Sequence, residues 1–519
     1  MAIFFSNLHL LILVLILAYL HEQTTAATET EYKWVKSSKI EPIANYDPTS
    51  ISATPYPPSN SGFETAMNQK GDTIAIASRL FTEGGEQGYV FGGVVNVYKQ
   101  QNYSAGESNA DKVWEPLGAE IIVSTDGAWN GKNILSFNED GTMIAIGSRS
   151  ANNKMGQAQV LRLDPQNNIW SLVGGEELMS GTQTGEEFGA AVGLSADGTT
   201  LVVGSPFYSE VTSTGETLEK VGRVSIFIFD SSIQQWISSK TNLIGEASKD
   251  EFGTSLALSA KGDLLAVGAP LNDGDETSVF GGRRLNGGHV RVYKQEANGV
   301  DWIQLGPDIN GEQYMDFSGN SLAMSYSVDR LEDHKIAVGA PDNDGLETSD
   351  TFDGRGHVRV FGYDESAATW EKLYYDIDGE SRGDNSGYSV ALDRTGSRLI
   401  VGGILSDGVD GNTIDAGHAR IFEVGYRGWT QVGNDLDGEE SSGHFGTSVQ
   451  MNGSGNRVIV GAPLVGDPGR YTGAVYVYDL IEISVQDPPD GGRTRSGSYC
   501  FRVWNSLQIG LLAMLYLIF

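Results

Sequence analysis

The sequence has a single cysteine, Cys500, among 519 residues. It lies in a C-terminal segment that we expect to be removed, so disulfides are excluded as the source of stability in the mature chain. Basic residues are also scarce, because 35 Lys and Arg face 67 Asp and Glu, a formal net charge of −32. Lys and Arg form no cluster, which argues against nucleic acid or anionic lipid and favours cations or basic partners.

Long hydrophobic runs are also lacking, since both apolar end segments fall short of the ~20 residues that a membrane-spanning helix needs. The first, Leu8 to Leu20, precedes Thr25-Ala26-Ala27, whose small residues are typical of a signal-peptidase site. We therefore expect a signal peptide over residues 1–27 and secretion of the protein.

The second apolar segment, Leu507 to Phe519, follows the small residues Ser496, Gly497 and Ser498 and a polar spacer. This order is typical of a glycosylphosphatidylinositol signal, with the lipid anchor near these small residues. A short transmembrane tail is the alternative. Either way, residues 481–498 form a linker and residues 499–519 an anchor signal at the cell surface.

One unit recurs along nearly all of the remaining chain, 28–480. Its clearest copy runs from Asp250 to Glu312, and each copy contains an alternating apolar run, a Gly-containing turn and a second apolar run. A variable polar loop, a run such as His289 to Tyr293 and a segment with one Trp follow. Alternating runs joined by Gly turns predict four antiparallel strands, the composition of a propeller blade.

The Trp residues give the number of blades. Six of them end the first six units, and the seventh unit stops at Tyr478 without one: Trp114, Trp170, Trp236, Trp302, Trp370 and Trp429. Trp34 precedes the first unit and fits the fourth-strand pattern. We therefore predict an all-β, seven-bladed propeller whose last blade is completed by the N-terminal strand around Trp34.

The pairs Phe188-Gly189, Phe252-Gly253 and Phe445-Gly446, followed downstream by Gly-Ala-Pro segments such as Gly268-Ala269-Pro270, resemble FG-GAP repeats. Such repeats form the seven-bladed propeller of the integrin α-subunit head. The resemblance implies an extracellular propeller used for recognition in surface and adhesion proteins, usually without catalysis.

Many integrin-type blades carry a calcium loop between their first two strands, but the corresponding turns here have too few carboxylates to hold an ion that takes about six to eight oxygens. Acidic residues gather instead in the loop after strand two. We take seven of them as candidate calcium ligands: Asp273, Asp275, Asp342, Asp344, Glu347, Asp407 and Asp410. Good turn formation by Asp-Gly sequences is the alternative explanation.

A second acidic set follows the Trp strand, in Asp376 to Glu380 and Asp435 to Glu439. In an up-and-down blade, the loop after strand two and the connector after strand four emerge on the same face. Both acidic sets are therefore predicted to share one face of the ring, here called the loop face.

Several tempting sites have simpler explanations. His289, His357 and His418 occupy one position of three successive units, so we interpret them as structural residues rather than as a zinc triad. The Trp residues likewise share one repeat position, which favours core packing. Arg382-Gly383-Asp384 aligns with blade connectors of sister units, although exposure on the loop face would leave integrin-type binding as an alternative.

We expect a membrane-anchored recognition or adhesion protein that binds an extracellular protein or glycan, with calcium as a further ligand. The alternative is a surface-coat or wall-associated protein in which the propeller is a spacer. A glycoside hydrolase is a third reading, but Ser195 to Thr199 lacks the Trp of the sialidase box and no central Arg set can be picked out. We therefore expect no enzyme. Asn102 and Asn452 stand in glycosylation sequons.

Overall fold

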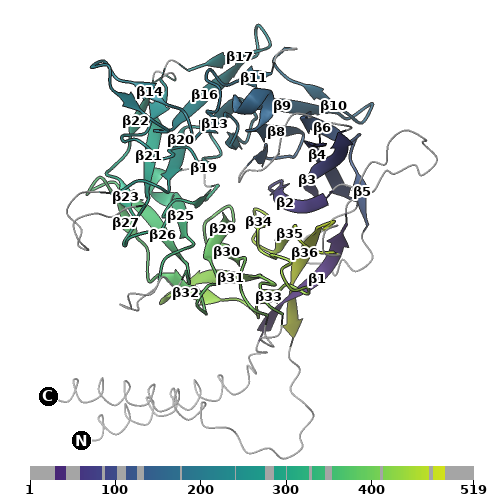
Figure 1. The fold of residues 1–519 in the computed structure, drawn as a ribbon. Coiled ribbons are helices and arrows are strands. Elements are labelled where there is room, and N and C mark those ends of the chain that lie inside the picture. The colour runs from purple at the N-terminus through teal and green to yellow at the C-terminus, as the bar shows by residue number, and fades with distance from the viewer. Residues whose placement is uncertain are drawn as a thin grey trace, which may run out of the picture. The chain divides into compact units, whose positions relative to one another are not determined.

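The computed structural model contains a ring of seven antiparallel sheets around a central axis (Figure 1). The structure describes residues 30–41, 59–84, 88–101, 113–124, 134–175, 178–239, 241–274, 286–297, 299, 301–326, 330–344, 354–408, 413–466 and 471–484. The chain divides into two compact units, one of Met1–Glu31 with Glu482–Phe519 and one of Tyr32–Ile481. The ring belongs to the second unit. Among the described residues, no helix is long and apolar enough to cross a membrane.

Blades 1 to 3 follow one another along the chain. Blade 1 has β2 (Ser59–Met67), β3 (Thr73–Gly84), β4 (Gly88–Gln100) and β5 (Trp114–Pro116). Blade 2 has β7 (Leu135–Phe137), β8 (Met143–Ser148), β9 (Gln157–Asp164) and β10 (Ile169–Leu172). Blade 3 has β12 (Ala191–Leu194), β13 (Thr200–Ser205), β16 (Arg223–Asp230) and β17 (Gln235–Ser238).

Blades 4 to 6 repeat this order. Blade 4 has β19 (Ser255–Leu258), β20 (Leu264–Ala269), β21 (His289–Gln295) and β22 (Trp302–Gln304). Blade 5 has β24 (Ser321–Met324), β25 (Lys335–Ala340), β26 (His357–Asp364) and β27 (Thr369–Lys372). Blade 6 has β29 (Ser386–Leu392), β30 (Arg398–Gly403), β31 (His418–Gly425) and β32 (Gly428–Gln431).

Blade 7 joins the two ends of the ring. It contains β34 (Ser448–Met451), β35 (Arg457–Ala462), β36 (Ala474–Ser484) and the N-terminal strand β1 (Thr30–Ile40). Trp34 lies on β1 and is buried against blades 6 and 7. The predicted closure by the N-terminal strand is therefore confirmed, and Figure 1 shows β1 beside β36.

The blades contain one feature that the repeat did not predict. In blades 1 to 6, the connector from strand four to the next blade contains a short fifth strand that pairs with the third strand of the same blade. These strands are β6 (Ile121–Ser124), β11 (Met179–Ser180), β18 (Leu243–Ile244), β23 (Ile309–Asn310), β28 (Ile377–Asp378) and β33 (Leu436–Asp437). Minor elements of the described chain are the hairpin of β14 (Glu210–Val211) and β15 (Thr217–Leu218), the helical turn α2 (Ala151–Lys154) and the 3₁₀ turn η2 (Leu331–Asp333).

The glycines of the FG-GAP motif form the joints between blades. A Cβ placed on Gly268 of blade 4 would lie 2.1 Å from the carbonyl oxygen of Gly319 in blade 5. The same approach closes the ring, because a Cβ on Gly461 of blade 7 would lie 2.0 Å from the carbonyl oxygen of Gly62 in blade 1. A side chain at either position would force the neighbouring blades apart, so the motif is explained by close backbone contact.

The core lies between neighbouring blades rather than within one sheet. Phe252 of blade 4, for example, packs with Val224 of blade 3 and with Trp302 of its own blade in one buried cluster. Several Trp side chains also donate a hydrogen bond to the preceding blade, as Trp370 Nε1 does to the carbonyl oxygen of Leu305 at 2.9 Å. The expectation that the Trp position packs the core agrees with this arrangement.

Candidate functional site

The loop after strand two and the connector after strand four meet on the loop face. Gly288, just before β21, forms a bridge with Ser318, just before β24 of the next blade, and Gly356 forms the same bridge with Ser386. Each pair joins the end of a two-to-three loop to the end of a four-to-one connector. The loops of neighbouring blades are therefore in direct contact on this face.

At the centre of the loop face lies a cavity of about 360 Å³. All seven blades contribute to its wall: Phe63, Arg79, Arg149, Ala190, Pro206, Phe207, Glu251, Thr254, Asn320, Tyr388 and Thr447. Most of these side chains belong to two repeat positions. One position follows the first-strand glycine of the motif, and the other follows strand two, where the strong repeats have the Pro of Gly-Ala-Pro.

In the six blades whose first-strand glycine is described, the position after it holds five kinds of side chain although the glycine itself remains. It holds Phe63 after Gly62, Ala190 after Gly189, Thr254 after Gly253, Asn320 after Gly319, Tyr388 after Gly387 and Thr447 after Gly446. A rigid ring of backbone joints thus presents a set of different side chains at its centre. Binding residues on a fixed scaffold have this character.

Two arginines stand where strong repeats have proline. Arg79 follows Ala77-Ser78 in blade 1, and Arg149 follows Gly147-Ser148 in blade 2. The guanidinium of Arg79 lies 5.0 Å from the ring centre of Phe63, and that of Arg149 lies 5.7 Å from the ring centre of Phe207. Each cation is therefore held against an aromatic ring of the cavity wall.

The charges around the cavity are partly balanced. Arg149 donates hydrogen bonds from Nε, at 2.6 Å, and from Nη2 to the buried carboxylate of Glu187. Burial raises the pKa of Glu251, and the nearby Lys220 and Arg149 oppose this shift. Burial also lowers the pKa of Arg79, which means that its surroundings disfavour the positive charge.

The described candidate calcium ligands accept hydrogen bonds from their own loops or from a neighbouring connector. Three of them accept a backbone N–H from the far end of their own loop: Asp273 from Asn286 at 3.1 Å, Asp344 from Gly354 at 3.2 Å and Asp407 from Asp415 at 3.1 Å. Asp342 accepts a hydrogen bond from the side-chain amide of Asn385 at 2.8 Å. Asp275, Glu347 and Asp410 lie outside the described residues.

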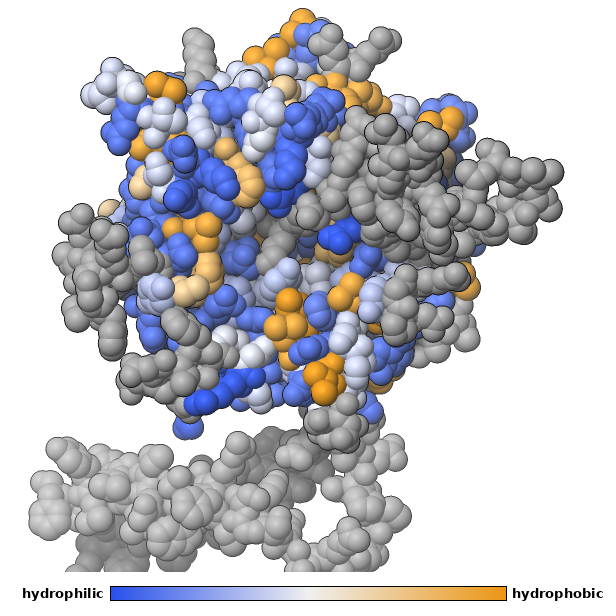
Figure 2. Space-filling view, in the orientation of Figure 1, coloured by the Kyte–Doolittle hydropathy of each residue, from blue (hydrophilic) through white to orange (hydrophobic). Residues whose placement is uncertain are grey.

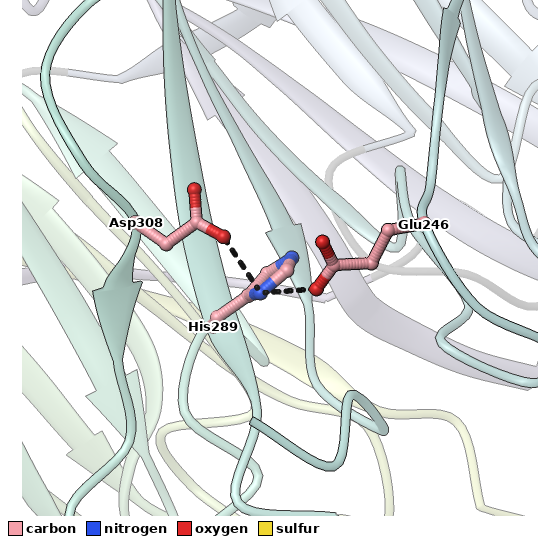
Figure 3. Close-up of side chains that lie close together, drawn as sticks. All are labelled: Glu246, His289 and Asp308. Atoms are coloured by element: carbon pink, nitrogen blue, oxygen red, sulfur yellow. Dashed lines mark ion pairs between the residues drawn. The ribbon is translucent and has the colours of Figure 1, made fainter. Parts of the chain in front are cut away.

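Groups that could hold a metal occur at another repeat position. Three clusters of one His and two carboxylates place their ligand atoms within 4.8 Å of one another: Glu246, His289 and Asp308; Glu312, His357 and Asp376; Glu380, His418 and Asp435. Figure 3 shows the first cluster, in which His289 Nδ1 lies 3.7 Å from Glu246 and 3.6 Å from Asp308. In each cluster the Glu comes from the preceding blade.

An arginine already neutralises the carboxylates of these clusters. Arg291 contacts Asp308 at 3.0 Å and also pairs with Glu246. Burial opposes the charge of Arg291, but its hydrogen bonds to Asp308 outweigh that effect and raise its pKa. Burial and the neighbouring Arg359 lower the pKa of His357 to about 3, so this imidazole is neutral at physiological pH. The clusters connect adjacent blades, in keeping with the structural interpretation of the histidines.

Integrin-type binding by Arg382-Gly383-Asp384 would require an exposed aspartate, and the structure does not place Asp384 at the surface. The side chain of Asp384 is buried, with 2% of the residue exposed, and its carboxylate accepts the backbone N–H of Ser381 at 2.7 Å. Asp250 and Asp316 occupy the same connector position and are equally buried. The expected exposure is wrong for Asp384, because its carboxylate holds the connector together and does not face a partner.

Of the two glycosylation sequons, only that of Asn452 lies among the described residues. Asn452 is 1% exposed, and its Nδ2 donates to Ser454 at 3.1 Å and to Asn456 at 2.9 Å. A glycan on Nδ2 would have to replace these bonds, so we expect Asn452 to be unmodified in the folded turn. Asn102, the signal peptide and the anchor residues Ser496, Gly497 and Ser498 lie outside the described residues.

Sequence reasoning missed the central cavity and its arginines. The available signal was a departure from the repeat, since the first two units have Arg79 and Arg149 where the strong units have Pro. These two units are among the weaker copies of the repeat, in which a substitution is easily interpreted as loss of the motif. Hydropathy alone would not have located the cavity either. Figure 2 shows that hydrophilic residues cover most of the described surface in that view and that hydrophobic ones are scattered among them.

The ring and its loop face define the class of the protein: it is a seven-bladed β-propeller of up-and-down blades. Residues 436–478 match the family model described as FG-GAP repeat. This segment leads into blade 7 and forms most of it. This match and the seven-bladed ring confirm the resemblance to FG-GAP propellers.

The other comparisons add little. No curated protein matches the chain. Among solved structures, one from Bacteroides uniformis ATCC 8492, provisionally assigned as a 6-phosphogluconolactonase, is 12% identical with a TM-score of 0.47 and covers 79% of this chain and 100% of that chain. A likeness this distant carries no argument about activity.

Proposed function

We propose that this protein is an extracellular recognition propeller that binds a protein or glycan on its loop face, at the central cavity. One observation carries the proposal: the close glycine joint recurs on the second strands of blades 2 to 7, whereas the residue after the first-strand glycine is of five different types in the six blades where it is described, and lines the cavity. Concave sites with a few polar groups among apolar ones are typical of ligand binding. An FG-GAP propeller fits such a protein-binding role.

Secretion and anchoring belong to the same proposal. The sequence favours a signal peptide and a C-terminal lipid anchor, which would place the propeller outside the cell. Phosphatidylinositol-specific phospholipase should release the protein from intact cells. Retention after this treatment would favour a transmembrane tail.

The binding test uses pull-down and glycan-array measurements with residues 28–490, which include the complete ring. Tyr388→Ala should weaken binding because Tyr388 lines the cavity. Tyr426→Ala is the matched control, since Tyr426 is fully exposed at 101% and lies between β31 and β32. A ligand that binds both variants equally would place recognition elsewhere, and no ligand at all would favour a structural spacer.

We propose binding without turnover. Glycoside hydrolysis usually needs two carboxyl groups at the scissile bond, and Glu251 is the one carboxylate among the described residues that line the cavity. A panel of glycoside substrates tests this directly. Turnover that Glu251→Gln abolishes would contradict the proposal and favour an enzyme.

Calcium is a further proposed ligand, bound by the acidic loops after strand two. Asp273, Asp344 and Asp407 hold the bases of these loops, so the proposed ion would bind to loops that are closed at their ends. Binding to the folded state alone raises the melting temperature by mass action. Millimolar calcium should therefore raise it, and an unchanged melting temperature would exclude this ligand.

A further inference from the structure

The central cavity combines three kinds of group. Arg79 and Arg149 supply cations, Phe63 and Phe207 supply apolar ring surface, and polar side chains such as Asn320 complete the wall. The two arginines come from neighbouring blades 1 and 2, Arg79 within the long second strand β3 and Arg149 immediately after β8. A ligand in the cavity can therefore contact positive charge on one side and neutral polar groups on the other.

The aromatic rings fix where the cations lie. Phe207 has the guanidinium of Arg149 at 5.7 Å from its ring centre and the ammonium of Lys220 at 4.3 Å. Phe63 holds Arg79 in the same way at 5.0 Å. Cations placed against rings keep donor groups available at a defined position, and planar guanidinium groups suit the two oxygens of a carboxylate.

The surroundings of Arg79 favour an incoming anion. Burial lowers its pKa, so the folded protein holds this charge at a cost in free energy that a bound carboxylate would reduce. The half-buried Tyr388 is the neighbouring group in the wall, and burial together with Glu64 raises its pKa. Its hydroxyl therefore stays protonated at neutral pH and can donate a hydrogen bond.

Two features limit the charge of the ligand. Glu251 places a carboxylate in the same wall, which would repel a second negative group and can accept a hydrogen bond from a hydroxyl. The net charge of −32 repels polyanions at long range. Thr254, Asn320 and Thr447 add side chains that pair with hydroxyl groups. A single carboxylate on a polyhydroxylated body satisfies all of these conditions.

We propose that the central cavity binds a uronate, a sugar with one carboxylate, with Arg79 as its main carboxylate contact. This inference rests on the proposed recognition function and names its ligand class. A volume of about 360 Å³ is at the small end of ligand pockets, which run from about 300 to 1,000 Å³, and suits one sugar residue at the end of a chain.

The experiment measures binding of sodium D-glucuronate to the purified protein by titration calorimetry or ligand-observed NMR. Methyl β-D-glucoside tests the need for the carboxylate, and sodium acetate tests the need for the sugar. We expect each to bind at least about tenfold more weakly than glucuronate, since each lacks one set of contacts. Equal binding of glucuronate and the neutral glucoside, or of glucuronate and acetate, would overturn the proposal.

Variants locate the site. Arg79→Gln should weaken glucuronate binding at least about tenfold, whereas Arg79→Lys keeps the charge and should weaken it less. Arg394→Gln is the matched control, because Arg394 also lies against an aromatic ring, 5.3 Å from that of Tyr326, but in the turn between strands one and two on the opposite face. It should leave binding unchanged.

Thermal unfolding of each variant separates loss of the site from loss of the fold. A folded Arg79→Gln protein that binds glucuronate like the wild type would overturn the proposal, and so would an Arg394→Gln protein that loses binding equally. If glucuronate does not bind but another ligand from the array binds in a Tyr388-dependent way, the uronate proposal is rejected and the recognition function is retained. Failure of every ligand would reject both.

Discussion

Blades 1 and 2 differ from blades 4 and 5 at the position where the motif ends. Blades 2, 4 and 5 share the close backbone joint at Gly147, Gly268 and Gly339, whereas blade 1 has Ala77 at this position. Two residues further along, the first pair of blades holds Arg79 and Arg149 and the second pair holds Pro270 and Pro341. The shared positions hold the ring together, and the positions that differ supply the chemistry at its centre. In a repeat protein, a weak copy is therefore the place to look for a site.

The polar links between blades show the same division. Blades 4 to 6 each use a Glu, His, Asp and Arg cluster at the joint with the preceding blade. The closing joint uses different residues. Arg457 of blade 7 is fully buried, donates to Asp479 at 2.6 Å and 2.8 Å, and also reaches Gly71 and Gln100 of blade 1.

The largest expected effect is at the closing joint. Arg457→Met should lower the free energy of unfolding by about 3–5 kcal/mol, because it removes the buried guanidinium that pairs with the buried carboxylate of Asp479. Urea denaturation measures the loss. Arg330→Met is the control, since Arg330 is 67% exposed and its solvent-screened pairs with Glu332 and Asp333 should contribute little to stability. Equal effects would show that closure does not depend on Arg457.

The shared glycine joint comes next. Gly268→Ala should lower the free energy of unfolding by about 1–3 kcal/mol, since the new Cβ would lie 2.1 Å from the carbonyl oxygen of Gly319. Gly425→Ala, whose nearest atom would be 3.7 Å away, is the matched control and should cost little. Melting temperatures of the two variants check this, and a tolerated alanine at Gly268 would refute the account of the motif.

The Trp position offers a pair of equivalent residues in adjacent blades. Trp370 and Trp302 are about equally buried, but Trp370 Nε1 donates to Leu305 whereas Trp302 Nε1 has no hydrogen-bond partner among the described residues. Trp370→Phe should therefore cost about 0.5–1.5 kcal/mol more than Trp302→Phe. Chemical denaturation of both variants measures the difference, and equal losses would mean that packing alone stabilises this position.

The smallest effect depends on pH. Burial raises the pKa of Asp250 from 3.8 to about 6, with Glu246 adding to the shift, so the folded protein binds this proton more tightly than the unfolded chain does. Stability from this group is greatest below pH ~4 and is lost as the pH rises through ~6.

Asp250→Asn removes the charge and retains an oxygen for the N–H of Ala247. The variant should melt about 1–3 °C above the wild type at pH 7.5 and match it at pH 4. A variant less stable than the wild type at pH 7.5 would show that the ionised carboxylate is favourable in the connector.

Much of the fold could be predicted because each prediction depended on a pattern within one unit. Alternation and Gly turns gave the strands, and the displaced Trp34 gave the closure, since a missing fourth strand at Tyr478 has to be supplied from elsewhere in the chain. The short fifth strands, such as β23, escaped prediction because two residues show no periodicity.

The candidate site was harder to predict. The acidic loops stood out by composition, yet Asp273 and Asp344 accept bonds that close their own loops. Asp384 looked exposed in a polar connector and is buried. Composition identifies charged side chains but does not say whether they face solvent, a neighbouring strand or one another.

The sequence by itself determined the seven-bladed architecture, the joining of its ends and the acidic character of the protein, because all three follow from repeated local patterns and from composition. Only the tertiary structure decided which repeat positions meet at the axis. Phe63 and Arg79 belong to the first unit and Arg149 to the second, and they line one cavity with residues of the other five blades because the ring turns equivalent positions of every blade toward one centre.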